Sequence, residues 1–294
     1  MFGRIVEIAE NGRYLHADRG FLVVECRGEK IGQVPLDDIA AVIANAHGLV
    51  YSNQLLVVLA AREVPFVLCA NNHNPVAIIW PLVGHHRQAE RMDAQLAAKK
   101  PLQKRLWQQI VRAKILWQAH VLKSVSQPDA PLSALVKRVS SGDAKNVEAQ
   151  AARRYWPLLM GKGFIRDTDA EGANSLLNYG YTVLRAATAR GVLAAGLHPG
   201  LGLHHCNPYN TMRLVDDLME PYRPLVDLLV WRLVREGAEN VDKNSKRELV
   251  HLLYQDFTTS YGTTPLLNCV QRLATSLAMI YLGKLSNLEI AMPD

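Results

Sequence analysis

The hydrophobic periodicity of this chain changes once along its length, and this change limits the possible fold more than any other feature. In the first eighty or so residues, short runs rich in β-branched and aromatic residues alternate with turn signals such as Asn11-Gly12, a pattern typical of β-strands. From Pro81–Gly84 onward, apolar residues recur at three- and four-residue steps, the period of an amphipathic helix. The chain is therefore expected to be an α+β protein, with a small β-rich N-terminal domain followed by a larger all-helical C-terminal domain.

Individual elements follow from the same patterns. The predicted strands are Arg4–Ala9, Phe21–Cys26, Lys30–Pro35, Ile39–Ala44, Pro65–Cys69 and Val76–Trp80, and Ser52 is a plausible N-cap for a helix over residues 53–62. The predicted long helices are Gln88–Lys99, Leu102–Ser124, Asp143–Leu159, Gly172–Ala195, Met212–Arg235, Lys246–Phe257 and Pro265–Leu282. Pro221 and Pro224 are expected to break or kink the fifth of these helices. The expected domains are residues 1–84 and 101–294, joined by a linker over residues 85–100.

Composition limits the class of protein. A chain of 294 residues suits one large or two smaller domains, and its net charge of +6 is consistent with a polyanionic partner, although many basic proteins bind no nucleic acid. The four cysteines form no Cys-x-x-Cys pair, so neither a zinc ribbon nor a redox motif is indicated, and reduced thiols in the cytoplasm are expected. No apolar run approaches ~20 residues, so no membrane span is expected.

The segment over residues 201–223 contains a candidate metal site. It begins with His204 and His205 and continues into an amphipathic stretch in which Asp217 and Glu220 lie three residues apart, on one face of a helix. An imidazole beside two carboxylates suits Mg²⁺ or Mn²⁺ better than a structural zinc ion. The alternative is that the acidic pair is only a solvated helix face.

A strongly basic stretch runs from His85 to Lys123, with Trp107 and Trp117 interleaved. Such a helix can lie along a phosphate backbone, where each neutralised phosphate releases counterions. An equally good interpretation is a solvated surface whose tryptophans belong to the core.

Two further segments carry polar residues within predicted helices. Glu148 is flanked by small residues that would let a ligand approach its carboxylate, although an exposed helical glutamate is the more common case. Asn174 and Asn178 lie four residues apart, and we interpret them as architectural.

Four blocks of sequence then match a known pattern. They are Gly142-Asp-x-x-Asn-x-Glu148-Ala-x-Ala-Ala-x-x-Tyr155, Asn174-x-Leu-Leu-Asn-Tyr-Gly-Tyr181, Ala195-Gly-Leu-x-Pro-Gly-Leu-Gly-Leu-x-His205 and Leu214-x-x-Asp217-Leu-x-Glu220-Pro-x-Arg-Pro224. Together they resemble Cas1, the CRISPR adaptation integrase family, and the compact size and doubled histidine look most like the members found in type II systems. The blocks cover about residues 140–225, and the strand-then-helix order fits the whole length.

The resemblance implies a catalytic metal site made of Glu148, His205 and Glu220. Asp217 matches a second acid of the last block and is expected to support the same site. The implied ion is Mg²⁺ or Mn²⁺, with no other cofactor. Arg223 also fits the block, and it would either orient Glu220 or contact a phosphate.

The resemblance also implies a reaction and partners. The 3′-hydroxyls of a protospacer DNA duplex attack phosphodiesters at the CRISPR leader-repeat boundary, so the enzyme is a metal-dependent endonuclease and integrase. The implied partners are double-stranded DNA, the small Cas2 protein and a second copy of the chain paired through the β-rich domain, with the type II effector nuclease as a further candidate. The candidate DNA-contacting residues match no strict motif, and they are His85, His86, Arg87, Lys104, Arg105 and Arg112.

Two other classes of function remain open on the sequence. One is a non-catalytic DNA-binding module that uses the basic helix alone, and the other is a scaffold that only organises a nucleoprotein complex. Converging acidic residues argue against the first, because carboxylates repel phosphates unless a cation lies between them.

Overall fold

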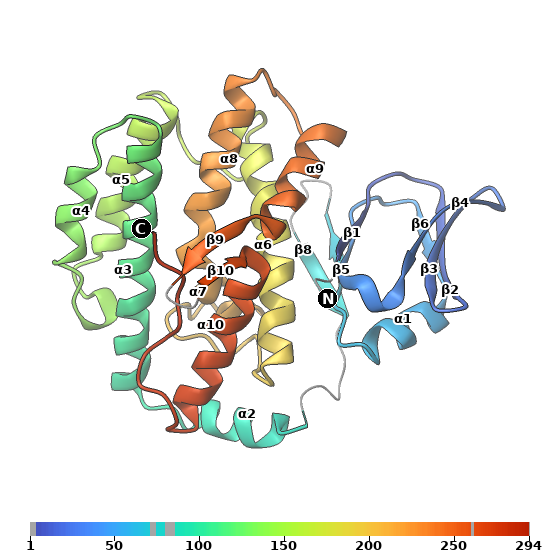
Figure 1. The fold of residues 1–294 in the computed structure, drawn as a ribbon, viewed down its shortest axis with the longest axis horizontal. Helices are drawn as coiled ribbons and strands as arrows, with labels where there is room; N and C mark the ends of the chain where they lie inside the picture. Colours follow the sequence, from blue (N-terminus) through green and yellow to red (C-terminus); the bar gives the residue numbers. More distant parts are fainter. Residues whose placement is uncertain (1–3, 71–74, 80–85, 260–261, 294) are drawn as a thin grey trace. The chain divides into compact units, whose positions relative to one another are not determined.

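The computed structural model describes residues 4–70, 75–79, 86–259 and 262–293. It divides into two compact units, Met1–His86 and Arg87–Asp294 (Figure 1). The first unit is rich in strands and the second is mainly helical, which confirms the predicted α+β class. The range expected as a linker contains helix α2 (Gln88–Leu96), close to the helix predicted over Gln88–Lys99, and its Arg91 and Gln95 are buried in the second unit.

The N-terminal unit contains two four-stranded sheets. One sheet has the order β1 (Arg4–Ile8), β5 (Ile39–Ala44), β7 (Phe66–Cys69) and β8 (Pro75–Ile79), with parallel pairing except between β7 and β8. The other has the order β4 (Glu29–Pro35), β3 (Phe21–Cys26), β2 (Arg13–Asp18) and β6 (Leu49–Tyr51), with antiparallel pairing except between β2 and β6. A short 3₁₀ turn over Leu36–Asp38 connects β4 to β5.

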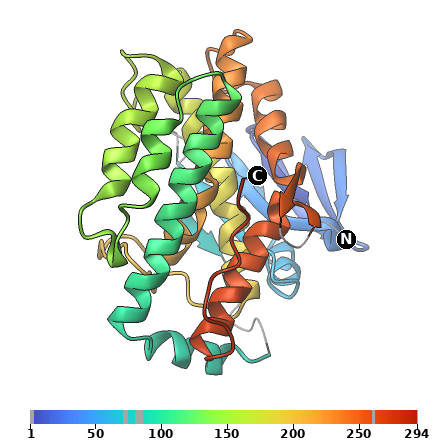
Figure 2. The same cartoon turned by 60° about the vertical axis from the view of Figure 1, so that its left-hand side comes forward.

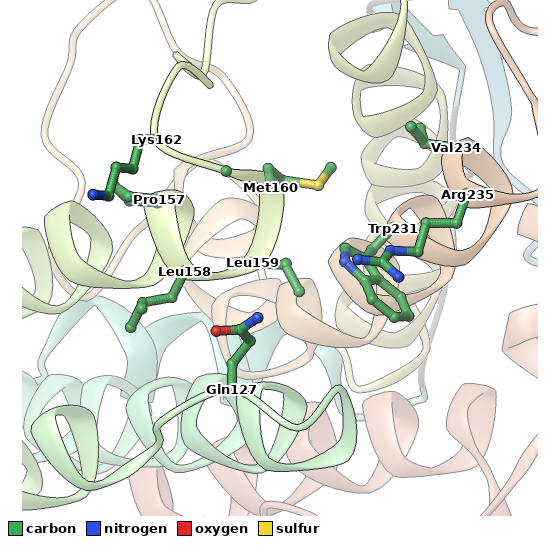
Figure 3. Close-up of a pocket in the computed structure, with 10 residues that line it drawn as sticks. Gln127, Pro157, Leu158, Leu159, Met160, Lys162, Trp231, Val234 and Arg235 are labelled. Carbon is green, nitrogen blue, oxygen red and sulfur yellow. The ribbon is translucent and has the colours of Figure 1, made fainter.

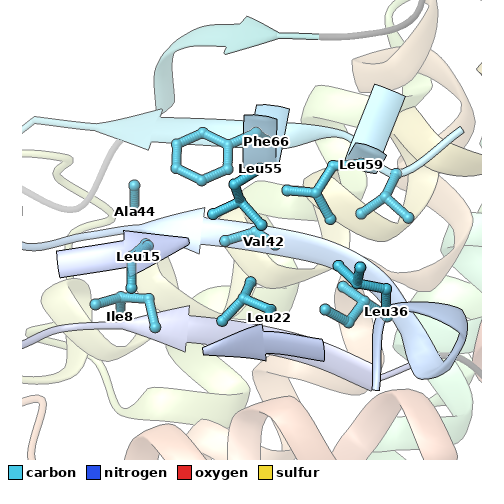
Figure 4. Close-up of a cluster of buried hydrophobic side chains, with 11 residues drawn as sticks. Ile8, Leu15, Leu22, Leu36, Val42, Ala44, Leu55, Leu59 and Phe66 are labelled. Carbon is cyan, nitrogen blue, oxygen red and sulfur yellow. The ribbon is translucent and has the colours of Figure 1, made fainter. Parts of the chain in front are cut away.

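The core of this unit forms where the central strand β5 meets helix α1 (Asn53–Ala60). Every residue of β5 is buried, as the uninterrupted apolar sequence of a central parallel strand requires. Helix α1 begins as predicted, because the Ser52 hydroxyl accepts a hydrogen bond of 3.2 Å from the amide of Leu55. Leu55 and Leu59 of this helix pack with Val42 and with Phe66 of β7 (Figure 4).

The second unit consists of helices and one hairpin. The helices are α2, α3 (Lys100–Ser124), α4 (Ala130–Val136), α5 (Val147–Met160), α6 (Ala173–Ala194), α7 (Arg213–Met219), α8 (Arg223–Arg235), α9 (Lys243–His251) and α10 (Leu266–Tyr281). Short 3₁₀ turns lie over Ser141–Asp143, Glu220–Tyr222 and Leu252–Tyr254, and β9 (Asp256–Thr259) pairs with β10 (Gly262–Pro265). Within this unit, α10 packs along α6, and α3 packs against α5 and α8 (Figure 2).

Helix α6 is largely buried within the second unit. It packs against α7, α8, α9 and α10, and it is apolar on nearly all sides, as a central helix must be. Gly180 lets it approach α8 and α9, because a Cβ atom there would lie 2.5 Å from Cγ1 of Val226 and 3.0 Å from Cδ2 of Leu249.

Some elements differ from the sequence predictions. Strands β2, β6, β9 and β10 and helix α4 were not predicted, and the helix expected over Lys246–Phe257 ends at His251. The strands β6, β9 and β10 have only three or four residues, which is too short for a clear alternating pattern, and α4 begins within a proline-containing turn segment. No helix among the described residues is long and apolar enough to cross a membrane.

The close approach at Gly180 makes a stability prediction. We expect Gly180→Ala to lower the free energy of unfolding by about 1–3 kcal/mol through overpacking, despite the better helix propensity of alanine. Denaturant unfolding monitored by circular dichroism measures this change. Gly191→Ala in the same helix is the matched control, because its nearest neighbour would lie at 3.6 Å, and it should be neutral or stabilising. Equal stability of the two variants would contradict this account of the packing.

Candidate functional site

Glu148 is placed by the start of helix α5. The chain turns sharply before this helix, where Gly142 has φ of +71°. The carboxylate of Asp143 then accepts hydrogen bonds of 2.9 Å from the amides of both Val147 and Glu148, which have no partner within the helix. This capping fixes Glu148 in the first turn, with 23% of its side chain exposed.

Glu220 is placed by the break between helices α7 and α8. The sequence predicted an interruption at Pro221, and the structure confirms it as a 3₁₀ turn over Glu220–Tyr222. The turn is buried, and the Glu220 side chain is only 5% exposed. A carboxylate this deep requires a positively charged partner.

Lys114 of helix α3 supplies that partner, a role that no sequence pattern indicated. Its ammonium donates hydrogen bonds of 2.5 Å to Oε1 of Glu148 and of 2.5 Å to Oε2 of Glu220. Burial opposes the charge of Lys114, but the carboxylates of Glu220 and Glu148 outweigh burial and raise its pKa. In the sequence, Lys114 is only one of the many basic residues between His85 and Lys123.

Arg223 completes the surroundings of Glu220. Its Nε lies 3.1 Å from Oε1 of Glu220, and its guanidinium stacks 4.7 Å from the ring centroid of Tyr181. Burial raises the pKa of a carboxylic acid, but here Arg223 and Lys114 overcome that effect and hold the pKa of Glu220 below its ordinary value. Of the two roles left open for Arg223, the structure therefore supports the orientation of Glu220.

His205 is paired with Asp217, which is fully buried. Its Nδ1 lies 2.6 Å from Oδ1 of Asp217, and this hydrogen bond, together with the negative charges nearby, raises the pKa of the imidazole against the effect of burial. Oδ2 of Asp217 also accepts hydrogen bonds from the amides of Leu203 (2.6 Å) and His204 (3.1 Å). Asp217 therefore fixes both the loop and the ring, and Nε2 of His205 is the nitrogen that stays available for a ligand.

The loop reaches Asp217 because residue 202 is a glycine. A Cβ atom at Gly202 would lie 2.9 Å from Oδ2 of Asp217 and 2.9 Å from Cβ of Arg213. The glycine of the Gly-Leu-His-His sequence is thus explained by the close approach of backbone to carboxylate.

Trp107 of helix α3 packs under both histidines. Its ring stacks on His204 at a centroid distance of 4.3 Å and meets His205 edge-on at 5.8 Å. Trp107 and Trp117 are both buried, so the tryptophans of the basic helix belong to the core. Trp107 nevertheless belongs to the site, because it limits the positions of the histidine rings.

The donor set suits a hard divalent ion, although the ligands are not gathered around one point. In the described part of the chain, no group of three or more His, Cys, Asp or Glu side chains forms a metal-binding cluster. Instead, two carboxylates converge on the Lys114 ammonium, and the negative charge of Glu220 contributes to the raised pKa of His205. Two carboxylates that share a bound cation, with one imidazole nearby, are suitable ligands for Mg²⁺ or Mn²⁺.

Comparison with known proteins identifies the family. The sequence pattern of the family described as CRISPR associated protein Cas1 matches residues 6–258. The CRISPR-associated endonuclease Cas1 of Neisseria meningitidis serogroup C is 36% identical, over 92% of this chain and 89% of that protein. The chain belongs to the Cas1 family.

Other relatives agree with this assignment. A CRISPR-associated endonuclease Cas1 of Pyrobaculum aerophilum is 30% identical, over 86% of this chain and 89% of that protein. Among solved structures, a casposase bound to integration product has the same fold, with a TM-score of 0.82 and 19% identity over 97% of this chain and 92% of that one. A Cas1 protein from Thermotoga maritima has a TM-score of 0.75 and 16% identity, over 99% of this chain and 100% of that one.

The candidate DNA-contacting residues of this Cas1 protein lie in different settings. His85 lies outside the described residues, and His86 is exposed. Arg87 pairs with Glu90 at 2.5 Å, and Arg112 donates a hydrogen bond of 3.1 Å to the carbonyl of Val139. Lys104 and Arg105 are exposed near the start of α3.

The paired asparagines of the Cas1 motif are architectural in the structure. Arg166 donates hydrogen bonds to the side-chain oxygens of Asn174 (3.0 Å) and Asn178 (2.6 Å). The two amide nitrogens donate in turn to the carbonyls of Ile165 and Thr168. The asparagines thus fasten the loop before α6 to that helix.

A pocket of about 420 Å³ is separate from the residues proposed for catalysis. It is lined by the ends of helices α5 and α8, including Met160, Trp231 and Arg235 (Figure 3). It shares no residue with the cluster around Lys114.

A pH-dependent prediction follows from Asp227 of helix α8, which accepts a hydrogen bond from the hydroxyl of Tyr181. Burial raises the pKa of Asp227 from 3.8 to about 6. The folded protein therefore keeps this proton to a higher pH than the unfolded chain, and folding stability is lost as the pH rises from about 4 to about 6. Asp227→Asn removes this titration, so we expect it to gain stability relative to the natural chain over that range, by at most about 3 kcal/mol.

Denaturant unfolding at several pH values between 4 and 7 measures this difference. The result expected is a difference in unfolding free energy that grows with pH and then becomes constant. Parallel stability curves for the two proteins would show that Asp227 does not carry the raised pKa.

Proposed function

We propose that this chain is the metal-dependent DNA integrase and endonuclease of CRISPR spacer acquisition, with Glu148, His205 and Glu220 as its catalytic residues. The observation that carries the proposal is the convergence of Glu148 and Glu220, from separate elements, on one buried cation. An exposed helical glutamate or a solvated acidic face would not be built in this way. Family membership supplies the reaction class, since the relatives are named as endonucleases.

Glu148, Glu220 and Nε2 of His205 would hold the divalent ion, and Asp217 would orient the imidazole through its hydrogen bond with Nδ1. An ion held there would stabilise negative charge on the attacked phosphate and lower the pKa of the attacking hydroxyl. One imidazole among carboxylates leaves both Mg²⁺ and Mn²⁺ suitable.

The protein's own residues position the reaction. Asp217 keeps the proton of His205 on Nδ1, so that Nε2 presents its lone pair. Arg223 prevents rotation of the Glu220 carboxylate, and Trp107 restricts the histidine rings. Phosphodiester transfer to a DNA 3′-hydroxyl needs no covalent protein intermediate, so no side chain is assigned as a nucleophile.

The proposed substrates and partners follow from the family and the charge. The substrates are protospacer DNA and the CRISPR leader-repeat, held by the basic surface that includes Lys104 and Arg105. Cas2 is the proposed partner, in keeping with a solved Cas1–Cas2 complex whose Cas1-containing chain has this fold at 18% identity.

The β-rich unit, residues 1–84, would form the homodimer, and the catalytic domain would begin near residue 101. A type II system, with its effector nuclease, is the proposed setting.

The competing function is a DNA-binding scaffold without catalysis. It requires the basic surface but no arrangement of carboxylates around a cation. The two functions differ in whether activity depends on metal and on Glu220.

Catalysis at these residues makes a mutational prediction. We expect Glu148→Gln, His205→Ala and Glu220→Gln each to lower the rate of strand transfer by about 100-fold or more. Each substitution removes a proposed metal ligand, and not a residue that only orients a ligand. The assay uses short duplex DNA, a repeat-bearing plasmid, Cas2 and Mn²⁺, and it scores joined products on a gel. Glu236→Gln, an exposed site near the end of α8, is the matched control and should retain full activity. Strand transfer that persists in Glu220→Gln or in excess chelator would favour the scaffold.

A second prediction concerns Asp217. Its replacement by asparagine removes the negative charge and one of the two acceptor oxygens that hold His205 and its loop, so Mn²⁺ affinity should fall by about 10–100-fold. Calorimetric titration of the DNA-free protein measures this affinity, and Asp169→Asn, on an exposed loop, is the control. Unchanged affinity in Asp217→Asn would mean that the buried carboxylate does not act on the site.

A further inference from the structure

The Lys114 ammonium lies between Glu148 and Glu220, two of the residues proposed to hold the divalent ion. Its ammonium lies 2.5 Å from one oxygen of each glutamate, so those two oxygens are at most 5 Å apart. Two oxygens on opposite sides of a bound Mg²⁺ are about 4.2 Å apart. The ammonium therefore holds both carboxylates close to the spacing that a metal ion would impose.

Both oxygens of Glu220 face positively charged side chains while this arrangement persists. Oε2 accepts from Lys114, and Oε1 lies 3.1 Å from Nε of Arg223. A divalent ion beside Glu220 would be repelled by both cations at these distances, so one of the two has to withdraw before Glu220 can coordinate the ion.

Lys114 is the cation whose withdrawal frees both ligands at once. It contacts both glutamates, whereas Arg223 contacts Glu220 and is also held by stacking on the ring of Tyr181. A lysine is a point charge on a flexible stem, so it can leave with less disruption than a stacked guanidinium.

We propose that Lys114 is a built-in counterion of the metal-free protein, which keeps the two glutamates converged and which the divalent ion must displace. The proposal rests on the proposed metal site. It assigns Lys114 a positioning role in which it competes with the metal, and it explains why a lysine stands among the proposed ligands. Without this lysine, Glu148 and Glu220 would repel each other in the metal-free protein and would attract a divalent ion more strongly.

The test compares Mn²⁺ binding by Lys114→Met and by the natural chain. The methionine keeps the length and packing of the side chain but removes the charge. We expect Lys114→Met to bind Mn²⁺ at least about 10-fold more tightly, measured by calorimetry on chelator-treated protein without DNA. In chelator its melting temperature should be lower than that of the natural chain, and Mn²⁺ should raise the melting temperature by a larger amount.

Lys123→Met is the matched control, since it removes the same charge from an exposed site on the same helix. Its affinity should stay within twofold of the natural chain. Equal or weaker Mn²⁺ binding by Lys114→Met would overturn the proposal while leaving the metal site in place. Tighter binding by Arg223→Met alone would overturn it in favour of arginine withdrawal. Absence of saturable Mn²⁺ binding in every protein would overturn both this proposal and the proposed function.

A second variant covers the case in which Lys114→Met does not fold without metal. Lys114→Gln keeps hydrogen-bond donors and can be purified with Mn²⁺ present. Chelator should then remove the ion at least about 10-fold more slowly than from the natural chain. Equal or faster removal would again overturn the proposal.

Discussion

The buried ammonium of Lys114 between the carboxylates of Glu148 and Glu220 is the interaction around which the helical unit is organised. These three charges are largely withdrawn from water, and none of them would be tolerated there without the others. Removal of one member of such a group typically costs about 3–5 kcal/mol. The burial of these charges therefore requires helix α3, the start of α5 and the turn between α7 and α8 to keep fixed positions. The contacts of α3 with each of these elements provide that support.

One face of helix α3 connects the two halves of the site. Trp107 and Lys114 lie seven residues apart, which places them on the same side of the helix. Trp107 packs against the histidine loop, and Lys114 holds the glutamates. A rotation or shift of α3 would therefore disturb the imidazole and the carboxylates together. The basic sequence of this helix does not reveal its structural role, because Lys114 faces inward.

The two acidic residues Asp217 and Glu220 of the last motif block have different roles because their surroundings differ. Asp217 has no exposed surface and satisfies backbone amides and the ring of His205, whereas Glu220 faces the cations. Both are acids on adjoining turns, and the sequence placed both at one metal site. The difference arises because the loop after Gly202 covers Asp217, and the break at Pro221 turns Glu220 toward α3. Two similar residues thus acquire an orienting role and a proposed coordinating role.

The sequence by itself determined the α+β class, most of the long elements, the Ser52 cap and the break at Pro221, because these depend on local periodicity and on proline geometry. Motif blocks also nominated Glu148, His205 and Glu220, since spacing within a block survives in the linear chain. Short or polar elements such as β6 and the β9–β10 hairpin were missed, because their pairing partners and not their own residues stabilise them. Only the tertiary structure decided the role of Lys114 and the pairing of Asp217 with His205. Burial and proximity between distant segments create these roles, and no local pattern distinguishes one lysine of a basic helix from the next.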